Sequence, residues 1–364
     1  MTAGDFFGVV MAGGQGTRLW PFSRKRAPKQ SLKLAGDRTL FRETLDRIGL
    51  FPPDRILVAT TVDQTEMLRR QAPEIPYENF LVEPSPMGTA PVIGWAALEV
   101  RSRAPQGVMA CLPADHVIRN VARFHALLGA AYQAARQGHL VTLGIPPTYP
   151  AAGYGYIEQG ESLGQFEGID GYRAVSFREK PSPQKAEEYV RQGDFLWNSG
   201  MFVWKANRFL EEIDGHMPSL GAGLRAIEAQ PEGRARAAAR DRVWPTLKRE
   251  TLDYGIMERS AKVAVLPAPD LGWLDVGNWE RLFEVVQPDG DGNIVVGDRV
   301  AAVESARSLV YQAGGAPRLV AVFGAEDLIV VDTGDTVLVC PRHRAEDVRR
   351  LVERLEQAGF GEFL

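Results

Sequence analysis

The chain has 364 residues, which suits a large domain with a smaller one, because single hydrophobic cores stop growing at about 250–300 residues. Hydrophobic residues make up 45% and charged residues 24%, values that exclude a disordered or fibrous protein. With a net charge of −4 the chain has no general attraction for nucleic acid or an anionic membrane, so any polyanion must meet a local cluster of positive charge.

Short apolar runs alternate with helical periodicity in the first 150 residues. The spacing of Val121, Phe124 and Leu128 predicts a helix over 121–137. Strands are predicted at residues 6–12, 55–61, 80–83, 107–113 and 140–145. The alternation predicts an α/β fold with a parallel, Rossmann-like doubly wound sheet covered on both faces by helices, which binds its ligands at the carboxyl ends of the strands. The run at 6–12 is too short for a membrane span and has no basic segment before it, which favours a buried strand over a signal peptide.

The second half of the chain changes in texture. Residues 206–262 are predicted to be mostly helical, and the glycine-marked polar stretch at 287–293 predicts a boundary between domains at 1–286 and 287–364. Strands are predicted at 174–177, 201–204, 294–296, 300–303, 309–311, 319–323, 328–331 and 336–340, and helices at 183–191 and 345–357. The last strands resemble coils of a β-solenoid, and a small irregular sheet is the alternative because no clean repeat is present.

The chain holds two cysteines, Cys111 and Cys340, and both lie in apolar strand-like runs. Such thiols usually behave as small buried hydrophobes, and two of them cannot build a disulfide framework or a zinc site. A reducing cytoplasm is therefore the predicted compartment.

A glycine-rich loop follows the first strand. Bare backbone at Gly13, Gly14 and Gly16 lets several N–H groups converge on phosphate oxygens. The loop is neither a dinucleotide fingerprint, which would want a glycine at Leu19, nor a P-loop, which needs Gly-Lys-Ser/Thr. The sequence predicts another kind of phosphate loop.

Basic side chains crowd behind this loop, on a segment that Pro21 and Pro28 prevent from forming a regular helix. Arg18 is predicted to clamp phosphate oxygens and Lys29 to supply a compact positive charge. The neighbouring Lys25 and Arg26 are interpreted as solvated surface residues.

Two carboxylates are candidate metal ligands. Asp115 follows a buried strand, and Asp275 lies among apolar residues where a charge persists only with a counterion, hydrogen bonds or a metal. The alternative for each is a helix N-cap, with the helix after Asp275 beginning near Asn278. His116 is interpreted as an ordinary satisfied polar residue.

A third group of residues is polar and lies near predicted strands. Glu179 and Lys180 would face opposite sides of a strand, so a bend before Pro181 is required to bring both to one ligand. Gly155 offers a backbone amide in a loop, and Asn198 offers a side-chain amide, with a turn role as its alternative.

The stretch from Ala12 to Pro21, with Pro28-Lys29-Gln30 after it, resembles the signature of sugar-1-phosphate nucleotidylyltransferases. Within that family it is most similar to the mannose-1-phosphate guanylyltransferases, in the short form without an isomerase domain. The resemblance covers residues 7–279 and implies the nucleotide-diphospho-sugar transferase fold, with a mixed sheet and a small β-helix-like C-terminal domain. Thr89-Ala90-Pro91 matches the family, whereas the usual Gly-Arg-Asn before it is replaced by Ser85-Pro86-Met87-Gly88.

The resemblance implies transfer of GMP from GTP to mannose 1-phosphate, which gives GDP-mannose and pyrophosphate with Mg²⁺ as the cofactor. It implies that Asp115 and Asp275 bind the metal, that Lys180 binds the sugar phosphate, and that Arg18 and Lys29 stabilise pyrophosphate. The implied nucleotide-binding residues are Ala12, Gly13, Gly14, Gly16, Thr17, Arg18, Lys29, Glu83, Gly88, Thr89, Ala90 and Asp115. The implied substrate-binding residues are Gly155, Glu179, Lys180 and Asn198.

The resemblance also implies a homodimer through the C-terminal segment, and no nucleic acid or membrane partner is expected. Thr251 and Asp253 lie in a stretch that resembles a helix start that lines the sugar pocket in the family. An N-cap role explains these two residue types equally well, so neither is included in the predicted site. Rival functions are the same chemistry with dTTP, UTP or glucose 1-phosphate, a metal-dependent glycosyltransferase, and a non-catalytic nucleotide-sugar sensor. The glycosyltransferase would want an Asp-x-Asp motif, whereas Asp115 is followed by His116 and Val117.

Overall fold

The computed structural model describes residues 4–14, 16–34, 36–313 and 318–364, so Gln15 of the glycine loop lies outside the described residues. The chain divides into two compact units. Unit 1 comprises Met1–Gly13, Asp46–Pro113 and Ile118–Gly272, and unit 2 comprises Gly14–Leu45, Ala114–Val117 and Trp273–Leu364. The domain boundary after residue 286 stays a prediction.

Unit 1 is built on a mixed sheet, which has nine strands among the described residues, in the order β3-β2-β1-β4-β9-β6-β10-β8-β7. β1 runs parallel to β2 and β4, whereas β9 runs antiparallel to both β4 and β6. The strands are β1 (Phe6–Met11), β2 (Ile56–Thr61), β3 (Phe80–Glu83), β4 (Val108–Pro113), β6 (Leu140–Ile145), β7 (Tyr156–Phe166), β8 (Ile169–Arg178), β9 (Phe195–Lys205) and β10 (Val263–Pro267). The five predicted strands of the first 150 residues are therefore present, and the mixed sheet is confirmed.

Helices of unit 1 pack on this sheet and on one another. They are α2 (Val62–Gln71), α3 (Thr89–Arg103), α4 (Val121–Arg136), α5 (Pro183–Gln192), α6 (Ala206–His216), α7 (Pro218–Glu228) and α8 (Arg234–Val243). The predicted helix at 121–137 is α4, and its N-cap is Asn120, whose side chain accepts a hydrogen bond from Arg123 N at 3.0 Å. Trp204 of β9 stacks on Phe209 of α6 at 4.5 Å between ring centroids, and both rings are fully buried in the core of unit 1.

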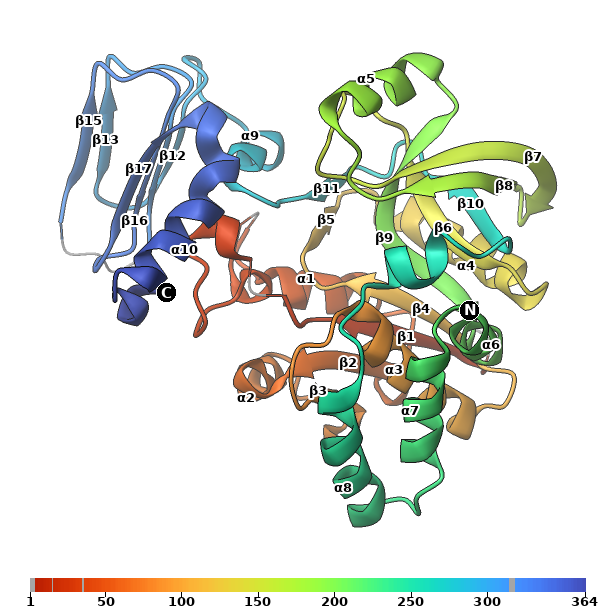
Figure 1. Ribbon diagram of the computed structural model, residues 1–364. Helices are drawn as coiled ribbons and strands as arrows, with labels where there is room; N and C mark the ends of the chain where they lie inside the picture. Colours follow the sequence, from red (N-terminus) through yellow and green to blue (C-terminus); the bar gives the residue numbers. More distant parts are fainter. Residues whose placement is uncertain (1–3, 15, 35, 314–317) are drawn as a thin grey trace. The chain divides into compact units, whose positions relative to one another are not determined.

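The long β7–β8 hairpin differs from the sequence expectation. Figure 1 draws these two strands side by side as a twisted pair, and their register runs from Tyr156 opposite Arg178 to Phe166 opposite Ile169. The sequence predicted only residues 174–177 of the hairpin, because its exposed outer half carries polar residues and glycines where a buried strand would be apolar.

Unit 2 contains the last part of the chain, where short strands stack in parallel. β12 (Ile294–Val296), β14 (Leu309–Gln312) and β16 (Leu328–Asp332) form one parallel ladder, and β13 (Val300–Val303) pairs in parallel with β15 (Val320–Phe323). Buried Ile294, Leu309 and Ile329 stand in register across the ladder. In Figure 1, β13 and β15 form a layer apart from the one that holds β12, β16 and β17. These stacked parallel strands confirm the predicted β-solenoid coils over the irregular sheet.

The remaining elements complete the two units. β17 (Val337–Pro341) runs antiparallel to β16 and closes the ladder. The others are α1 (Leu40–Arg47), β5 (His116–Ile118), β11 (Trp273–Asp275), α9 (Leu282–Val285) and α10 (Val348–Gln357). The closing helix begins later than predicted because residues 342–347 form a 3₁₀ turn. In the described part of the chain no helix has the length and apolar character needed to cross a membrane.

Candidate active site

The glycine loop begins where β1 ends. Ala12 stays tied to the sheet, since its N–H donates to the carbonyl oxygen of Ala59 at 2.8 Å and its own carbonyl accepts from Thr60 Oγ1 at 3.1 Å. Gly13 and Gly14 follow in irregular backbone.

Gly16 occupies a position that only glycine fits. It has φ +68°, and an added Cβ would lie 2.4 Å from Cβ of Lys29. The short distance shows that the backbone of Gly16 packs against the side chain of Lys29. The next residue, Thr17, begins a 3₁₀ turn that also contains Arg18. Gly16 and the two predicted cations, Arg18 and Lys29, therefore belong to one short region of unit 2.

Lys29 joins the two predicted metal ligands. Its Nζ lies 2.7 Å from Oδ2 of Asp115 and 2.7 Å from Oδ1 of Asp275, and the lysine is only 5% exposed. Asp115 stands in the turn between β4 and β5, and Asp275 is the last residue of β11. The sequence prediction that Asp115 and Asp275 lie together is confirmed by these distances.

The charges of this cluster stabilise one another. Burial acts to lower the pKa of Lys29, but the carboxylates of Asp115 and Asp275 outweigh it and hold the pKa above its usual value. Burial likewise acts to raise the pKa of Asp275, and the charge of Lys29 outweighs it and lowers the pKa to about 2. Lys29 and Asp275 are therefore ionised at neutral pH.

Neither aspartate caps a helix. Asp115 precedes strand β5, and the cap of the 3₁₀ turn after Asp275 is Asn278, whose side chain accepts from Arg281 N at 3.1 Å. His116 is buried and accepts a hydrogen bond at Nδ1 from Trp273 Nε1 at 3.2 Å, as expected for a satisfied polar residue.

Donors for a metal ion are few in this region. Among the described residues, no group of three or more His, Cys, Asp or Glu side chains is arranged to hold a metal. An ion bound by Asp115 and Asp275 would therefore take its remaining ligands from substrate and water, which is how Mg²⁺ is usually held.

The other predicted cations of the segment have acidic neighbours in unit 2. Arg18 is 37% exposed, and its Nε lies 3.2 Å from Oε2 of Glu346. The exposed Lys25 lies 3.3 Å from Glu356, and Arg26 is also exposed, in keeping with their interpretation as surface residues.

A further group of the predicted nucleotide-binding residues lies in unit 1, at the carboxyl end of β3 and the start of α3. These residues are Glu83, Gly88, Thr89 and Ala90. Glu83 is 6% exposed, and its Oε2 has no hydrogen-bond partner among the described residues. Burial raises the pKa of Glu83 to about 7, against a backbone hydrogen bond from Met87. Thr89 Oγ1 accepts from Leu252 N at 2.9 Å, and Ala90 N donates to Glu250 O at 3.4 Å.

Gly88 sets the backbone conformation directly before α3. Its φ is +89°, and an added Cβ would lie 2.3 Å from the carbonyl oxygen of Glu250. Only glycine therefore fits before α3.

The predicted sugar-binding residues also meet in unit 1. An added Cβ on Gly155 would lie 2.5 Å from Oε2 of Glu179 and 3.1 Å from Cβ of Asn198, so three separate segments converge there. Lys180 has φ +47° and its Nζ lies 3.3 Å from Oε1 of Glu179. The bend that the sequence required before Pro181 is thus present.

Asn198 lies inside β9 and makes both local and distant contacts. Its Oδ1 accepts from Gly200 N at 3.0 Å, as in a turn, while its Nδ2 donates to Oδ1 of Asp253 at 3.1 Å. Glu179 Oε2 has no hydrogen-bond partner in the described part of the chain, so this oxygen can accept a hydrogen bond from a ligand.

Asp253 is the functional candidate that sequence reasoning left out. It opens a short π-helix (Asp253–Met257), and burial together with the charge of Glu179 raises its pKa to about 7. The signal in the sequence was the stretch from Thr251 to Glu258, which resembles a helix start of the family. An N-cap role explained Asp253 equally well, so Asp253 was left out of the predicted site. In the structure Asp253 accepts a hydrogen bond from Asn198.

Comparison with known families shows the class of protein. The family model for nucleotidyl transferases matches residues 7–291, and that described as a MannoseP isomerase/GMP-like beta-helix domain matches residues 297–355. The chain belongs to the nucleotidyl transferase family.

Its relatives within that family make nucleotide sugars or act in polysaccharide synthesis, to judge by their names. The chain is 36% identical to a mannose-1-phosphate guanylyltransferase of Escherichia coli (strain K12), over 99% of this chain and 75% of that protein. It is 34% identical to the alginate biosynthesis protein AlgA of Pseudomonas putida, over 96% of this chain and 72% of that protein.

A solved structure has the same fold. A crystal structure described as that of a mannose-1-phosphate geranyltransferase from Thermus thermophilus superposes with a TM-score of 0.86 at 35% identity, over 97% of this chain and 99% of that one. Enzymes of the nucleotidyl transferase family generally use a divalent metal ion.

Proposed function

We propose that this chain transfers GMP from GTP to mannose 1-phosphate and forms GDP-mannose and pyrophosphate. The choice of substrates is supported by the 36% identity to a mannose-1-phosphate guanylyltransferase along 99% of the chain. The observation that carries the reaction type is the contact of Lys29 with both Asp115 and Asp275. In-line attack by an ionised phosphate needs no general base, so alignment and charge neutralisation are what the protein must supply.

The two aspartates fit Mg²⁺. Their donors are hard oxygen atoms, and the ammonium group of Lys29 is a stand-in cation already in contact with both. Bound Mg²⁺ would neutralise charge on the phosphates of GTP and of the departing pyrophosphate. Asp115 and Asp275 would hold the ion, while Lys29 and Arg18 bind phosphate oxygens.

Backbone N–H groups of the glycine loop would cradle the triphosphate with these cations. The residues concerned are Ala12, Gly13, Gly14, Gly16 and Thr17. Glu83 would read the base, because the Watson–Crick edge of guanine presents two neighbouring donors, N1–H and the 2-amino group, and an ionised carboxylate accepts both. Gly88, Thr89 and Ala90 would shape the pocket wall at the start of α3.

The sugar would be held by the second cluster of unit 1. Lys180 would bind the phosphate of mannose 1-phosphate, and it is 54% exposed and therefore accessible to a ligand. Glu179 Oε2 and the Asn198 amide would bind sugar hydroxyls, with the backbone of Gly155 alongside them.

A substrate panel tests the proposal. Pyrophosphate release is expected with GTP and mannose 1-phosphate in the presence of Mg²⁺, and it should be much slower with dTTP, UTP or glucose 1-phosphate. Equal rates with dTTP or UTP would move the assignment to another nucleotide. Binding of GDP-mannose without any turnover would instead identify a sensor.

Substitution of Lys180 tests the role of the sugar-phosphate cluster. Lys180→Ala is expected to abolish turnover, because the nucleophile loses its positioning cation. Lys185→Ala is the matched control, since Lys185 is 57% exposed and pairs only locally with Glu188 at 2.8 Å. An unchanged rate in Lys180→Ala would refute the role assigned to it.

A cytoplasmic location and a homodimer through the C-terminal segment remain part of the proposal. The partners proposed are GTP, mannose 1-phosphate, GDP-mannose and pyrophosphate, without nucleic acid or membrane.

A further inference from the structure

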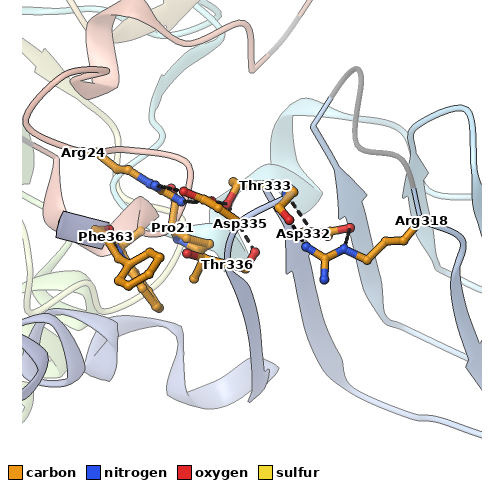
Figure 2. Close-up of polar contacts among 10 residues, drawn as sticks. Pro21, Arg24, Arg318, Asp332, Thr333, Asp335, Thr336 and Phe363 are labelled. Atoms are coloured by element: carbon orange, nitrogen blue, oxygen red, sulfur yellow. Dashed lines mark hydrogen bonds and ion pairs between the residues drawn. The ribbon is translucent and has the colours of Figure 1, made fainter. Parts of the chain in front are cut away.

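Arg24 lies between the two phosphate-binding cations in the sequence, yet its guanidinium is directed to the C-terminal strands of unit 2. Nη1 donates to Oδ2 of Asp335 at 2.6 Å, and Nη2 donates to Oδ1 of the same carboxylate at 2.6 Å. Nη2 also donates to Thr333 Oγ1 at 2.8 Å, and Nε donates to the carbonyl oxygen of Pro21 at 2.8 Å. Figure 2 shows this fork, in which the donors of Arg24 face Asp335 and Thr333.

The turn that carries Asp335 is itself well ordered by hydrogen bonds. It joins β16 to β17, and Thr333 closes it by donating from N to the carbonyl oxygen of Thr336 at 3.0 Å and from Oγ1 to Oδ1 of Asp335 at 3.0 Å. At its base the fully buried Asp332 accepts a hydrogen bond from Gly334 N at 2.8 Å. Oδ2 of Asp332 also lies 3.1 Å from Nε of Arg318, and Figure 2 shows these two side chains facing each other. The hydrogen bond from Arg24 keeps the pKa of Asp335 below its usual range, against partial burial.

Trp20 also fixes the segment around Arg24 to the C-terminal part of the chain. Trp20 Nε1 donates to the carbonyl oxygen of Phe363 at 2.8 Å, and the carbonyl of Trp20 accepts from Trp279 Nε1 at 3.0 Å. Arg24 and Ala27 exchange backbone hydrogen bonds at 2.9 and 3.0 Å, which closes the turn that leads to Lys29. A displacement of Arg24 would therefore also move the turn that leads to Lys29 and the backbone that leads back to Arg18.

We propose that Arg24 and Asp335 are positioning residues for nucleotidyl transfer, which hold the segment of residues 18–29 in the conformation that presents Arg18 and Lys29 to the phosphates. The C-terminal strands then influence phosphate binding through the bidentate ion pair of Arg24 and Asp335. This inference rests on the proposed phosphate-binding roles of Arg18 and Lys29. It gives Arg24 a positioning role in place of direct phosphate binding.

The decisive variant is Asp335→Asn in the full chain. The binding of pyrophosphate with Mg²⁺, measured by calorimetry, is expected to weaken about 10-fold, because loss of a charge-assisted fork corresponds to roughly that change in affinity. The KM for GTP is expected to rise by a similar factor, while the KM for mannose 1-phosphate stays unchanged. Arg24→Gln should reproduce these effects, and the double variant should be no worse than either single one.

Two further variants keep the test interpretable. Arg26→Gln is the control, because Arg26 is an exposed cation two residues away from Arg24 and should leave pyrophosphate binding unchanged. Thr333→Val removes one acceptor of Arg24 without changing a charge, so it serves if Asp335→Asn fails to fold, and it should weaken pyrophosphate binding to a smaller extent.

Several results would overturn the inference. If Arg24 binds phosphate directly, Asp335→Asn releases it and pyrophosphate binds as well as before or better, while Arg24→Gln weakens binding. If the pair only stabilises the fold, both variants lower the melting temperature and leave pyrophosphate affinity unchanged. Wild-type protein that binds pyrophosphate but makes no GDP-mannose would contradict the proposed function alone, since binding is measured without turnover.

Discussion

Glu83 is a buried carboxyl group whose Oε2 has no hydrogen-bond partner among the described residues. Burial raises its pKa to about 7, so near neutral pH it exists in both forms. A raised pKa means that the folded chain holds this proton more tightly than the unfolded chain does. The resulting stabilisation is complete below the ordinary value of 4.5 and is lost as the pH rises to about 7.

Base binding should depend on pH in the opposite direction, because only ionised Glu83 accepts both guanine donors. The KM for GTP in wild-type protein is expected to fall as the pH rises from 6 to 8. In Glu83→Gln it should be about 10-fold higher at pH 8, since hydrogen bonds to a charged group contribute about 1.5–3 kcal/mol. Titration of GTP itself affects both proteins equally, and exposed Glu78→Gln is the control. Parallel pH profiles for wild type and Glu83→Gln would exclude this role for Glu83.

Lys29 competes with a metal ion for two carboxylates. Because its ammonium group lies 2.7 Å from an oxygen of both Asp115 and Asp275, Lys29→Met is expected to bind Mn²⁺ about 10-fold or more tightly without nucleotide. Turnover should nevertheless be lost. Electron paramagnetic resonance of free Mn²⁺ during a titration measures the affinity.

The same variant should be less stable in EDTA and recover with Mn²⁺, since two neighbouring, partly buried carboxylates without a cation repel each other. Lys25→Met is the control, as Lys25 is exposed and pairs with Glu356 instead. If Lys29→Met bound Mn²⁺ no better than wild type, the ammonium would not be occupying a metal position.

At the scale of elements, Gly88 sets the start of α3. Gly88→Ala places a methyl group against the backbone of Glu250 at 2.3 Å, where no side chain can give way. The substitution is expected to cost about 3 kcal/mol or more of unfolding free energy and to raise the KM for GTP, because Thr89 and Ala90 move with the helix start.

Gly138→Ala is the matched control for this helix-start prediction. Gly138 also has a positive φ, +95°, but an added Cβ there would meet nothing within 4 Å. Its cost should therefore be only about 1–2 kcal/mol, from backbone strain alone, with normal KM values. Equal losses of stability in urea denaturation of the two variants would show that the Glu250 contact is unimportant.

The elements also show where sequence reasoning stops. Continuous apolar runs predicted β1, β2 and β4 well, because strands buried on both faces carry that pattern. The same pattern predicted a parallel sheet, and this was wrong for β9, which lies antiparallel between β4 and β6. A continuous apolar run reports burial on both faces and not the direction of a strand. The β7–β8 hairpin was largely missed because its outer half is not buried.

The candidate site has the same limit. The family resemblance paired Asp115 with Asp275, and both carboxylates do contact Lys29. Arg24 and Asp335 are 311 residues apart, and nothing local in the sequence pairs them. For Asp253 the local pattern of an N-cap competed with its actual contact to Asn198.

At the scale of the whole molecule, the proposed ligand groups fall into different units. The proposed metal ligands and the pyrophosphate-binding cations belong to unit 2, whereas the proposed sugar-binding residues belong to unit 1. A ligand that binds only the native state stabilises the segments that contact it. Each substrate should therefore slow amide hydrogen exchange in the segments that bind it.

Hydrogen exchange followed by mass spectrometry tests this division. Pyrophosphate with Mg²⁺ is expected to protect residues 16–31, 114–117 and 273–279 most strongly, and mannose 1-phosphate should protect 153–158, 195–200 and 251–257. Protection by pyrophosphate should largely vanish in EDTA, because the two aspartates then lack the ion that links them to phosphate. The Asp335→Asn variant should lose protection at 16–31 while it keeps that of the sugar segments. Mannose 1-phosphate that protected the glycine-loop segment most strongly would reverse the assignment of the two clusters, because the phosphate-binding cations would then serve the nucleophile rather than the leaving group.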